Sequence, residues 1–151
     1  MYKKHEIHNK ELMSKLNGEL EEIRRKISSL RKKGIDTKIV EYKIMNIPSK
    51  IKMAAITNKE LDVVMIHTTY KNIIADLDFL EMQYEEEQKK VAYMDELLTK
   101  ALAFLQVRQL RDCLPLYYEI RNFYKVLSLD SKQKVLDKCV KFYSDFQELA
   151  K

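Results

Sequence analysis

The sequence contains very few of the residues that form tight turns. Glycine and proline occur twice each in 151 residues, and tryptophan does not occur. With only Gly18 and Gly34 available, the chain cannot form a glycine-rich phosphate loop, a dinucleotide-binding fingerprint or a Gly-x-Ser-x-Gly nucleophile turn. Hairpin turn signals are also missing, and β-branched runs such as Val63-Val64 lie inside helical periods. The composition therefore indicates an all-α protein.

Cysteines and long apolar runs are scarce as well. Cys113 and Cys139 lie on apolar stripes, which favours free thiols packed in a core over a redox pair. No apolar run reaches the ~18 residues that a bilayer-spanning helix needs, and the charged start has no signal-peptide character. We expect a cytoplasmic protein without a membrane span.

Residues that bind metals or perform catalysis form no recognisable set. His5 and His8 are three residues apart, but no third ligand follows at helical spacing. His67 flanks an apolar seam, and no Glu-x-x-His pair of the di-iron bundles occurs. We predict no metal, no cofactor and no enzymatic activity.

Helical periodicity, by contrast, is abundant. Between Val63 and Arg108 apolar residues recur at the a and d positions of successive heptads, and only Glu87 interrupts them before the end. The polar stretch 81–90 keeps this register, so we expect one continuous helix over about 58–107; a break into two shorter helices within 81–90 is the open alternative. Thr57 and Glu60 have the spacing of a capping box at its start.

The rest of the chain predicts further helices. One covers about His5 to Lys33, with Gly34 at its end, and carries an apolar stripe of Met13, Leu16, Leu20, Ile23, Ile27 and Leu30. A second would begin at Asp36 or Thr37 and reach about Asn46. Pro48 then either starts a new helix or kinks the existing one.

Two more helices follow the heptad pattern of residues 63–108, which is called the ladder below. The first spans about 110–127 and tolerates Pro115 near its start. Asp130, with Gln133 three residues later, predicts the cap of the last helix. Its stripe contains Val135, Cys139, Phe142, Phe146 and Leu149, and Leu136, Val140 and Tyr143 broaden it.

Charge is segregated along the chain. Residues 1–60 contain 15 basic and 8 acidic residues, whereas residues 61–100 contain 4 and 9. Acidic Asp76, Glu81 and Asp95 flank the ladder and match the basic first helix in sign. We therefore predict that these two helices pack antiparallel within one chain. Pairing of the same seams between copies, in a homo-oligomer, is the open alternative, because heptads alone do not fix partner number.

The predicted architecture is a single all-helical domain over 1–151. Residues 1–92 would form a long, antiparallel, coiled-coil-like stalk with a corner at Pro48. Residues 93–151 would form a C-terminal three-helix pack, because apolar flanking residues widen the ladder's face there.

Two surfaces are candidates for a protein partner. The Pro48 corner places Met45, Lys50 and Met53 together, and methionine-rich grooves accept partner helices. The C-terminal helices carry more tyrosines than a small core buries, and tyrosine is favoured at interfaces. The candidate residues there are Tyr117, Tyr118 and Tyr124. The leading hypothesis is thus a non-enzymatic interaction module, a scaffold or adaptor.

The alternative hypothesis is a nucleic-acid-associated protein. Two basic clusters recur one heptad apart on the first helix, where they could contact a phosphate backbone: Arg24, Arg25 and Lys26, then Arg31, Lys32 and Lys33. That helix lacks base-stacking aromatic residues, which disfavours single-strand binding.

Residues 94–127 resemble a single tetratricopeptide repeat. Ala101 and Phe104 fall where the first helix of such a repeat carries small and aromatic residues, and Cys113 and Tyr117 do so in the second helix. Lys100, Ile120 and Lys125 depart from the pattern, and no second repeat follows at this period. The resemblance implies a helical hairpin of a kind that binds peptides or proteins in arrays.

Overall fold

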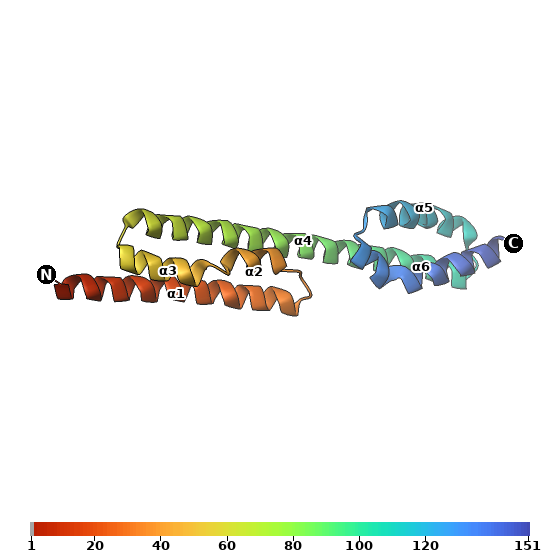
Figure 1. Cartoon of the computed structure of the whole chain (residues 1–151). Coiled ribbons are helices and arrows are strands. Elements are labelled where there is room, and N and C mark those ends of the chain that lie inside the picture. Colours follow the sequence, from red (N-terminus) through yellow and green to blue (C-terminus); the bar gives the residue numbers. More distant parts are fainter. Residues whose placement is uncertain (1) are drawn as a thin grey trace. The chain divides into compact units, whose positions relative to one another are not determined.

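The computed structural model describes the backbone of residues 2–151 and the side chains of residues 9–151. This part of the chain contains six α-helices and no strand, as Figure 1 shows, which confirms the all-α class. The helices are α1 (Tyr2–Lys32), α2 (Lys38–Ile44), α3 (Ile47–Thr57), α4 (Glu60–Gln106), α5 (Leu110–Val126) and α6 (Leu129–Ala150).

The chain divides into two compact units, one up to Met82 and one from Gln83 onward. The boundary lies inside α4, which is one continuous helix through the polar stretch 81–90, as predicted. The prediction of a single domain with a change of sub-region after residue 92 stays a prediction. Helices of the described chain contain no segment that is both long and apolar enough to cross a membrane.

Gly34 follows the end of α1, as predicted from the sequence. Its φ of +88° lies in the left-handed region that glycine adopts without strain. The Gly34 amide donates to the Arg31 carbonyl over 2.9 Å, and the Ile35 amide donates to the Leu30 carbonyl over 3.1 Å. These bonds satisfy carbonyls that the helix end would otherwise leave unpaired.

The chain then returns along α1 as α2 and α3. Pro48 is the second residue of α3, so a new helix starts there. The Asn9 side-chain amide donates to the Ala55 carbonyl over 3.1 Å, while Arg31, near the other end of α1, pairs with Glu41 of α2. Because early residues of α1 meet late residues of the return segment, α2 and α3 run antiparallel to α1.

The predicted antiparallel packing of the first helix against the ladder helix is wrong. The Tyr70 hydroxyl donates to the Leu16 carbonyl over 2.9 Å, and Lys33 Nζ lies 3.2 Å from Glu81 Oε1. Residue numbers rise together along both helices, so α1 and α4 are parallel (Figure 1). The physical reason is the return segment: α2 and α3 bring the chain back to the start of α1, and α4 then runs the same way as α1.

The start of α4 also differs from the prediction. Thr57 is the last residue of α3 and not a cap of α4. Asn58 follows in the left-handed region with a φ of 52°, and the Thr57 hydroxyl donates to Asp62 Oδ2 over 2.7 Å. The capping-box prediction for Thr57 and Glu60 is therefore wrong, because a hydroxyl engaged with Asp62 at the end of α3 does not cap α4.

Each unit has its own apolar core. In the first unit, the α1 stripe packs with α2, α3 and the early ladder positions, such as Ile73 and Leu77. In the second unit, Met94, Leu98 and Ala101 of α4 pack with Cys113 and Ile120 of α5 and with residues of α6. The heptad register thus indicates the buried face of α4 in both units.

The N-terminus of α6 is capped by Ser128, not by the predicted Asp130. The Ser131 amide donates to Ser128 Oγ over 3.2 Å. Glu87, the residue that breaks the heptad ladder, reaches the same turn. Its carboxylate accepts from the Ser131 hydroxyl over 2.8 Å and from the Ser128 amide over 3.3 Å. A carboxylate at a helix N-terminus is favoured by the helix dipole, which explains why this d position is acidic.

Candidate interaction surfaces

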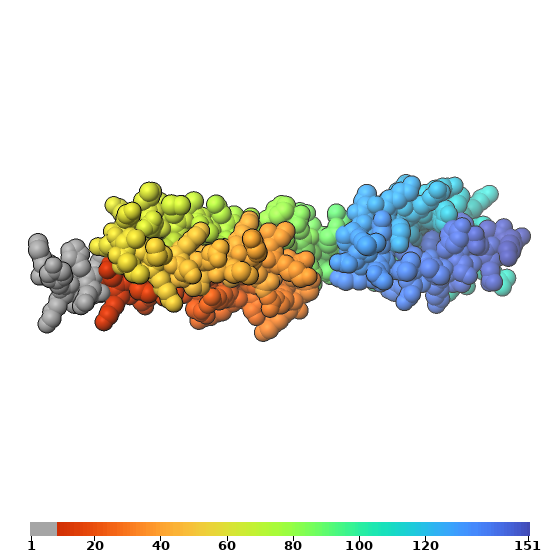
Figure 2. Space-filling model, viewed as in Figure 1, coloured from red at the N-terminus to blue at the C-terminus, as the bar shows by residue number. Residues whose placement is uncertain are grey.

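A groove of about 700 Å³ lies between α5 and α6 in the C-terminal unit. Figure 2 shows the two helices side by side on one face of that unit, in light and dark blue. Tyr117, Ile120 and Tyr124 line the groove from α5, and Leu136, Val140 and Tyr143 line it from α6. Two of the three tyrosines proposed from the sequence are therefore brought together here.

Aromatic contacts fix one end of this groove. The Tyr117 ring stacks on Phe146 at 4.7 Å between centroids and lies 6.3 Å from Tyr143. At the other end, the Lys132 ammonium lies 5.5 Å above the Tyr124 ring. Tyr118, the third proposed tyrosine, contacts Tyr117 edge to face but is exposed outside the groove.

Part of the exposed lining of the groove is an apolar stripe on α6. Leu136, Val140 and Tyr143 have exposed fractions of 42%, 59% and 49%. The sequence placed them at the edge of a buried stripe, because their spacing of four and three residues fits a wide core face. In the structure α6 buries only its other apolar side, through Val135 and Phe142, so this edge has no covering helix in the described chain.

Arg121 and Lys125 are the charged residues that line the groove. Both are exposed, and neither enters an ion pair within the region whose side chains are described. None of the described residues that line the groove carries a carboxylate. The site therefore combines apolar walls with a basic, uncompensated rim.

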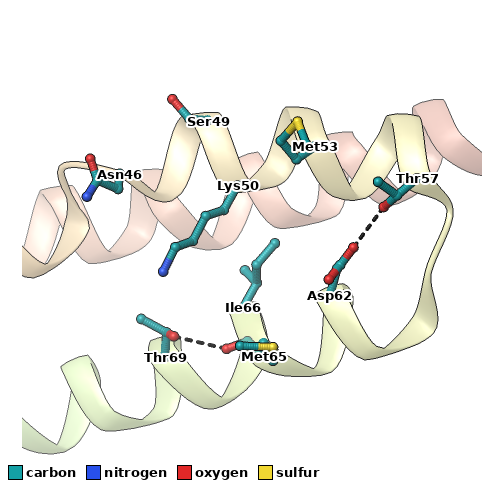
Figure 3. Close-up of a pocket in the computed structure, with 9 residues that line it drawn as sticks. All are labelled: Asn46, Ser49, Lys50, Met53, Thr57, Asp62, Met65, Ile66 and Thr69. Atoms are coloured by element: carbon teal, nitrogen blue, oxygen red, sulfur yellow. Dashed lines mark hydrogen bonds between the residues drawn. The ribbon is translucent and has the colours of Figure 1, made fainter.

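A second, smaller pocket of about 390 Å³ lies between α3 and α4 in the first unit, and Figure 3 shows its lining. Lys50 and Met53, both proposed from the sequence, line it from α3. Met65 and Ile66 line it from α4, and the Lys50 side chain extends toward the α4 side of the pocket. Of these four residues only Ile66 is buried, at 2% exposure, and it forms the apolar floor.

The other two residues of the proposed corner lie elsewhere. Met45 lines a separate recess of about 460 Å³ between α1 and α2, together with Arg24 and Arg31. Pro48 is half-buried in the first turn of α3 and lines none of these three pockets. The corner is thus divided between two recesses.

Most of the proposed nucleic-acid residues face carboxylates. Arg24 pairs with Glu21, Lys26 with Asp78, Arg31 with Glu41 and Lys33 with Glu81. Arg25 and Lys32 are exposed and enter no ion pair among the described side chains. Four of the six proposed residues are therefore already paired within their own unit.

Burial shifts the pKa of three titratable groups among the described residues. Burial raises the pKa of the Cys113 and Cys139 thiols, and both cysteines are free. Burial, helped by nearby Glu19, raises the pKa of Tyr70 to about 12. Glu19 lies 3.3 Å from His67 Nδ1. Among the described residues no three His, Cys, Asp or Glu side chains gather as metal ligands, and the His5 and His8 side chains lie outside them.

The chain matches no protein-family model, and neither the curated proteins nor the solved structures show a significant similarity to it. Its function is therefore argued from the surfaces described above.

Proposed function

We propose that this chain is a non-enzymatic helical protein–protein interaction module, a scaffold or adaptor. The observation that carries the proposal is the α5–α6 groove with its exposed Leu136, Val140 and Tyr143. Three apolar side chains in one stripe, with an aromatic-lined floor beside them, are typical of a surface that a partner covers. The resemblance of residues 94–127 to a single tetratricopeptide repeat implies a function of the same kind.

Site-specific photocrosslinking tests this proposal. A photoreactive phenylalanine analogue at Val140 should crosslink a protein partner in cells, whereas the same analogue at exposed Lys134, outside the groove, should not. Leu136→Asp in the Val140-labelled protein should abolish the crosslink, because a carboxylate opposes burial of the stripe. Equal crosslinking from both labelled positions, or none from Val140, would contradict the proposal.

The nucleic-acid alternative has less support. Binding to phosphates releases counterions in proportion to the free basic side chains that make contacts, and four of the six proposed residues already face carboxylates. Under that alternative, replacing Arg25 and Lys32 with glutamine would weaken binding to a DNA or RNA duplex and reduce its salt dependence. Under our proposal the same variant still forms the Val140 crosslink.

A further inference from the structure

We propose that the α5–α6 groove accepts an acidic amphipathic helix of a partner protein. This inference rests on the proposed function and adds the chemistry of the partner. Its basis is the combination of apolar walls with Arg121 and Lys125 as the charged lining residues.

The dimensions of the groove suit a helix of a few turns. On α6 the lining runs from Leu136 to Gln147, which corresponds to roughly 16 Å or three turns at 1.5 Å per residue. The walls are two helices that run antiparallel, since Tyr117 contacts Phe146 and Tyr124 lies beneath Lys132. A helix that lies along them would bury its own apolar stripe against Leu136, Val140 and Tyr143, the usual geometry of helix-in-groove recognition.

The charge of the rim selects an acidic partner. Four of the six clustered basic residues at positions 24–33 pair with carboxylates of their own unit, whereas Arg121 and Lys125 enter no ion pair among the described side chains. Glutamate or aspartate beside the apolar stripe of a bound helix would pair with them, whereas lysine or arginine would be repelled. Lys132, which covers Tyr124 at the end of the groove, adds positive charge of the same sign.

The aromatic arrangement disfavours a nucleic acid as the occupant. Base stacking needs an accessible ring face, and Phe146 already occupies a face of Tyr117. The exposed lining at Leu136 and Val140 is aliphatic, so it matches leucine or isoleucine side chains better than phosphates or sugars.

Fluorescence anisotropy with two designed peptides tests the inference on the full chain. Both are labelled helical peptides of about four turns with leucine at i, i+3, i+4 and i+7, and the remaining positions are mainly glutamate in one and lysine in the other. We expect the glutamate peptide to bind with a Kd at least about tenfold lower. Arg121→Glu combined with Lys125→Glu should reverse the preference, and Val140→Asp should remove binding of both peptides.

A matched control separates local charge from net charge. Lys134→Glu combined with Lys141→Glu changes the net charge equally on exposed α6 positions outside the groove, and it should keep the preference for the glutamate peptide. Circular dichroism of each variant verifies its helical fold.

The remaining outcomes would overturn the inference in distinguishable ways. Equal affinity for both peptides, or an equal effect of the control pair, would refute the acidic chemistry. If neither peptide binds while the Val140 crosslink forms, the acidic helix is refuted and the interaction module stands. If both the peptides and the crosslink fail, the proposed function fails as well.

Discussion

At the scale of single residues, Glu87 shows how one position links two distant segments. It occupies a d position of the ladder, where an apolar residue is expected, yet it binds the first turn of α6. Hydrogen bonding from the Ser131 hydroxyl lowers the pKa of the Glu87 carboxyl, and burial opposes this. The carboxylate form is therefore the one that the folded chain favours.

This arrangement predicts a pH-dependent contribution to stability. Because the folded-state pKa of Glu87 is lowered, its contribution is complete above the ordinary carboxyl pKa of 4.5 and is lost as the pH falls through the folded-state value. Glu87→Gln should lower the free energy of unfolding by about 1 kcal/mol at neutral pH. Urea unfolding followed by circular dichroism should show this difference shrinking as the pH is lowered below the ordinary carboxyl pKa.

The neighbouring Glu86 supplies the control. It is exposed and forms no side-chain hydrogen bond within the described part of the chain, so Glu86→Gln should leave stability nearly unchanged. A loss of the same size in both variants, or a Glu87 effect that persists in acid, would rule out the capping role.

The contact of Glu87 with the first turn of α6 was not predicted from the sequence, because it joins residues that are far apart in the chain. Glu87 and Ser131 are 44 positions apart, and no local pattern predicts that they meet. The same limit explains the groove. Tyr117 and Tyr124 were recognisable by type as candidate interface residues. That Leu136, Val140 and Tyr143 stay uncovered depends instead on which face of α6 the core uses.

At the scale of elements, the heptad pattern was the most informative feature of the sequence. Among the described side chains of α1, the buried ones are those of the predicted stripe from Leu16 to Leu30, because a 3.6-residue period places them on one face. The direction in which α1 packs against α4 was mispredicted, because opposite charges on the two helices are complementary in sign whether the helices run parallel or antiparallel. Lys33 and Glu81 are complementary in either orientation, and only the return of α2 and α3 decides between them.

The two glycines of the chain predict opposite effects of the same substitution. Gly34 has a φ of +88°, so Gly34→Ala introduces backbone strain, although an added Cβ would meet no atom within 4 Å. We expect Gly34→Ala to destabilise the chain by about 1 kcal/mol. Gly18 lies inside α1 with the same open surroundings, so Gly18→Ala should stabilise it by up to about 1 kcal/mol.

Thermal unfolding of the two glycine variants beside the parent chain measures the difference. If both substitutions shifted the melting temperature in the same direction, the left-handed φ of Gly34 would not be what determines the effect of an alanine there.

At the scale of the whole molecule, the chain has two cores that share one helix. Leu77 and Leu98 are both fully buried on α4, the first in the core of the N-terminal unit and the second in that of the C-terminal unit. Their burial is equal, so they offer a matched pair for asking whether the units unfold together.

Leucine-to-alanine substitutions at these positions should each cost about 2–5 kcal/mol, because each leaves a cavity. We expect Leu98→Ala to speed amide exchange across α5 and α6 while the amides of α1 and α3 keep their protection, and Leu77→Ala to do the reverse. Hydrogen exchange followed by mass spectrometry reads both patterns. Faster exchange throughout the chain in either variant would show one cooperative unit.

The parallel arrangement of α1 and α4 has a consequence for protein synthesis. The residues that pair between them are 48 to 54 positions apart, whereas the return segment follows α1 directly. At translation rates of about 5–20 residues per second, the face of α4 emerges roughly 3–10 s after the α1 stripe that it covers. The nascent chain must therefore carry a partly uncovered apolar helix for several seconds. The order of the helices sets the length of the period in which a chaperone can bind it.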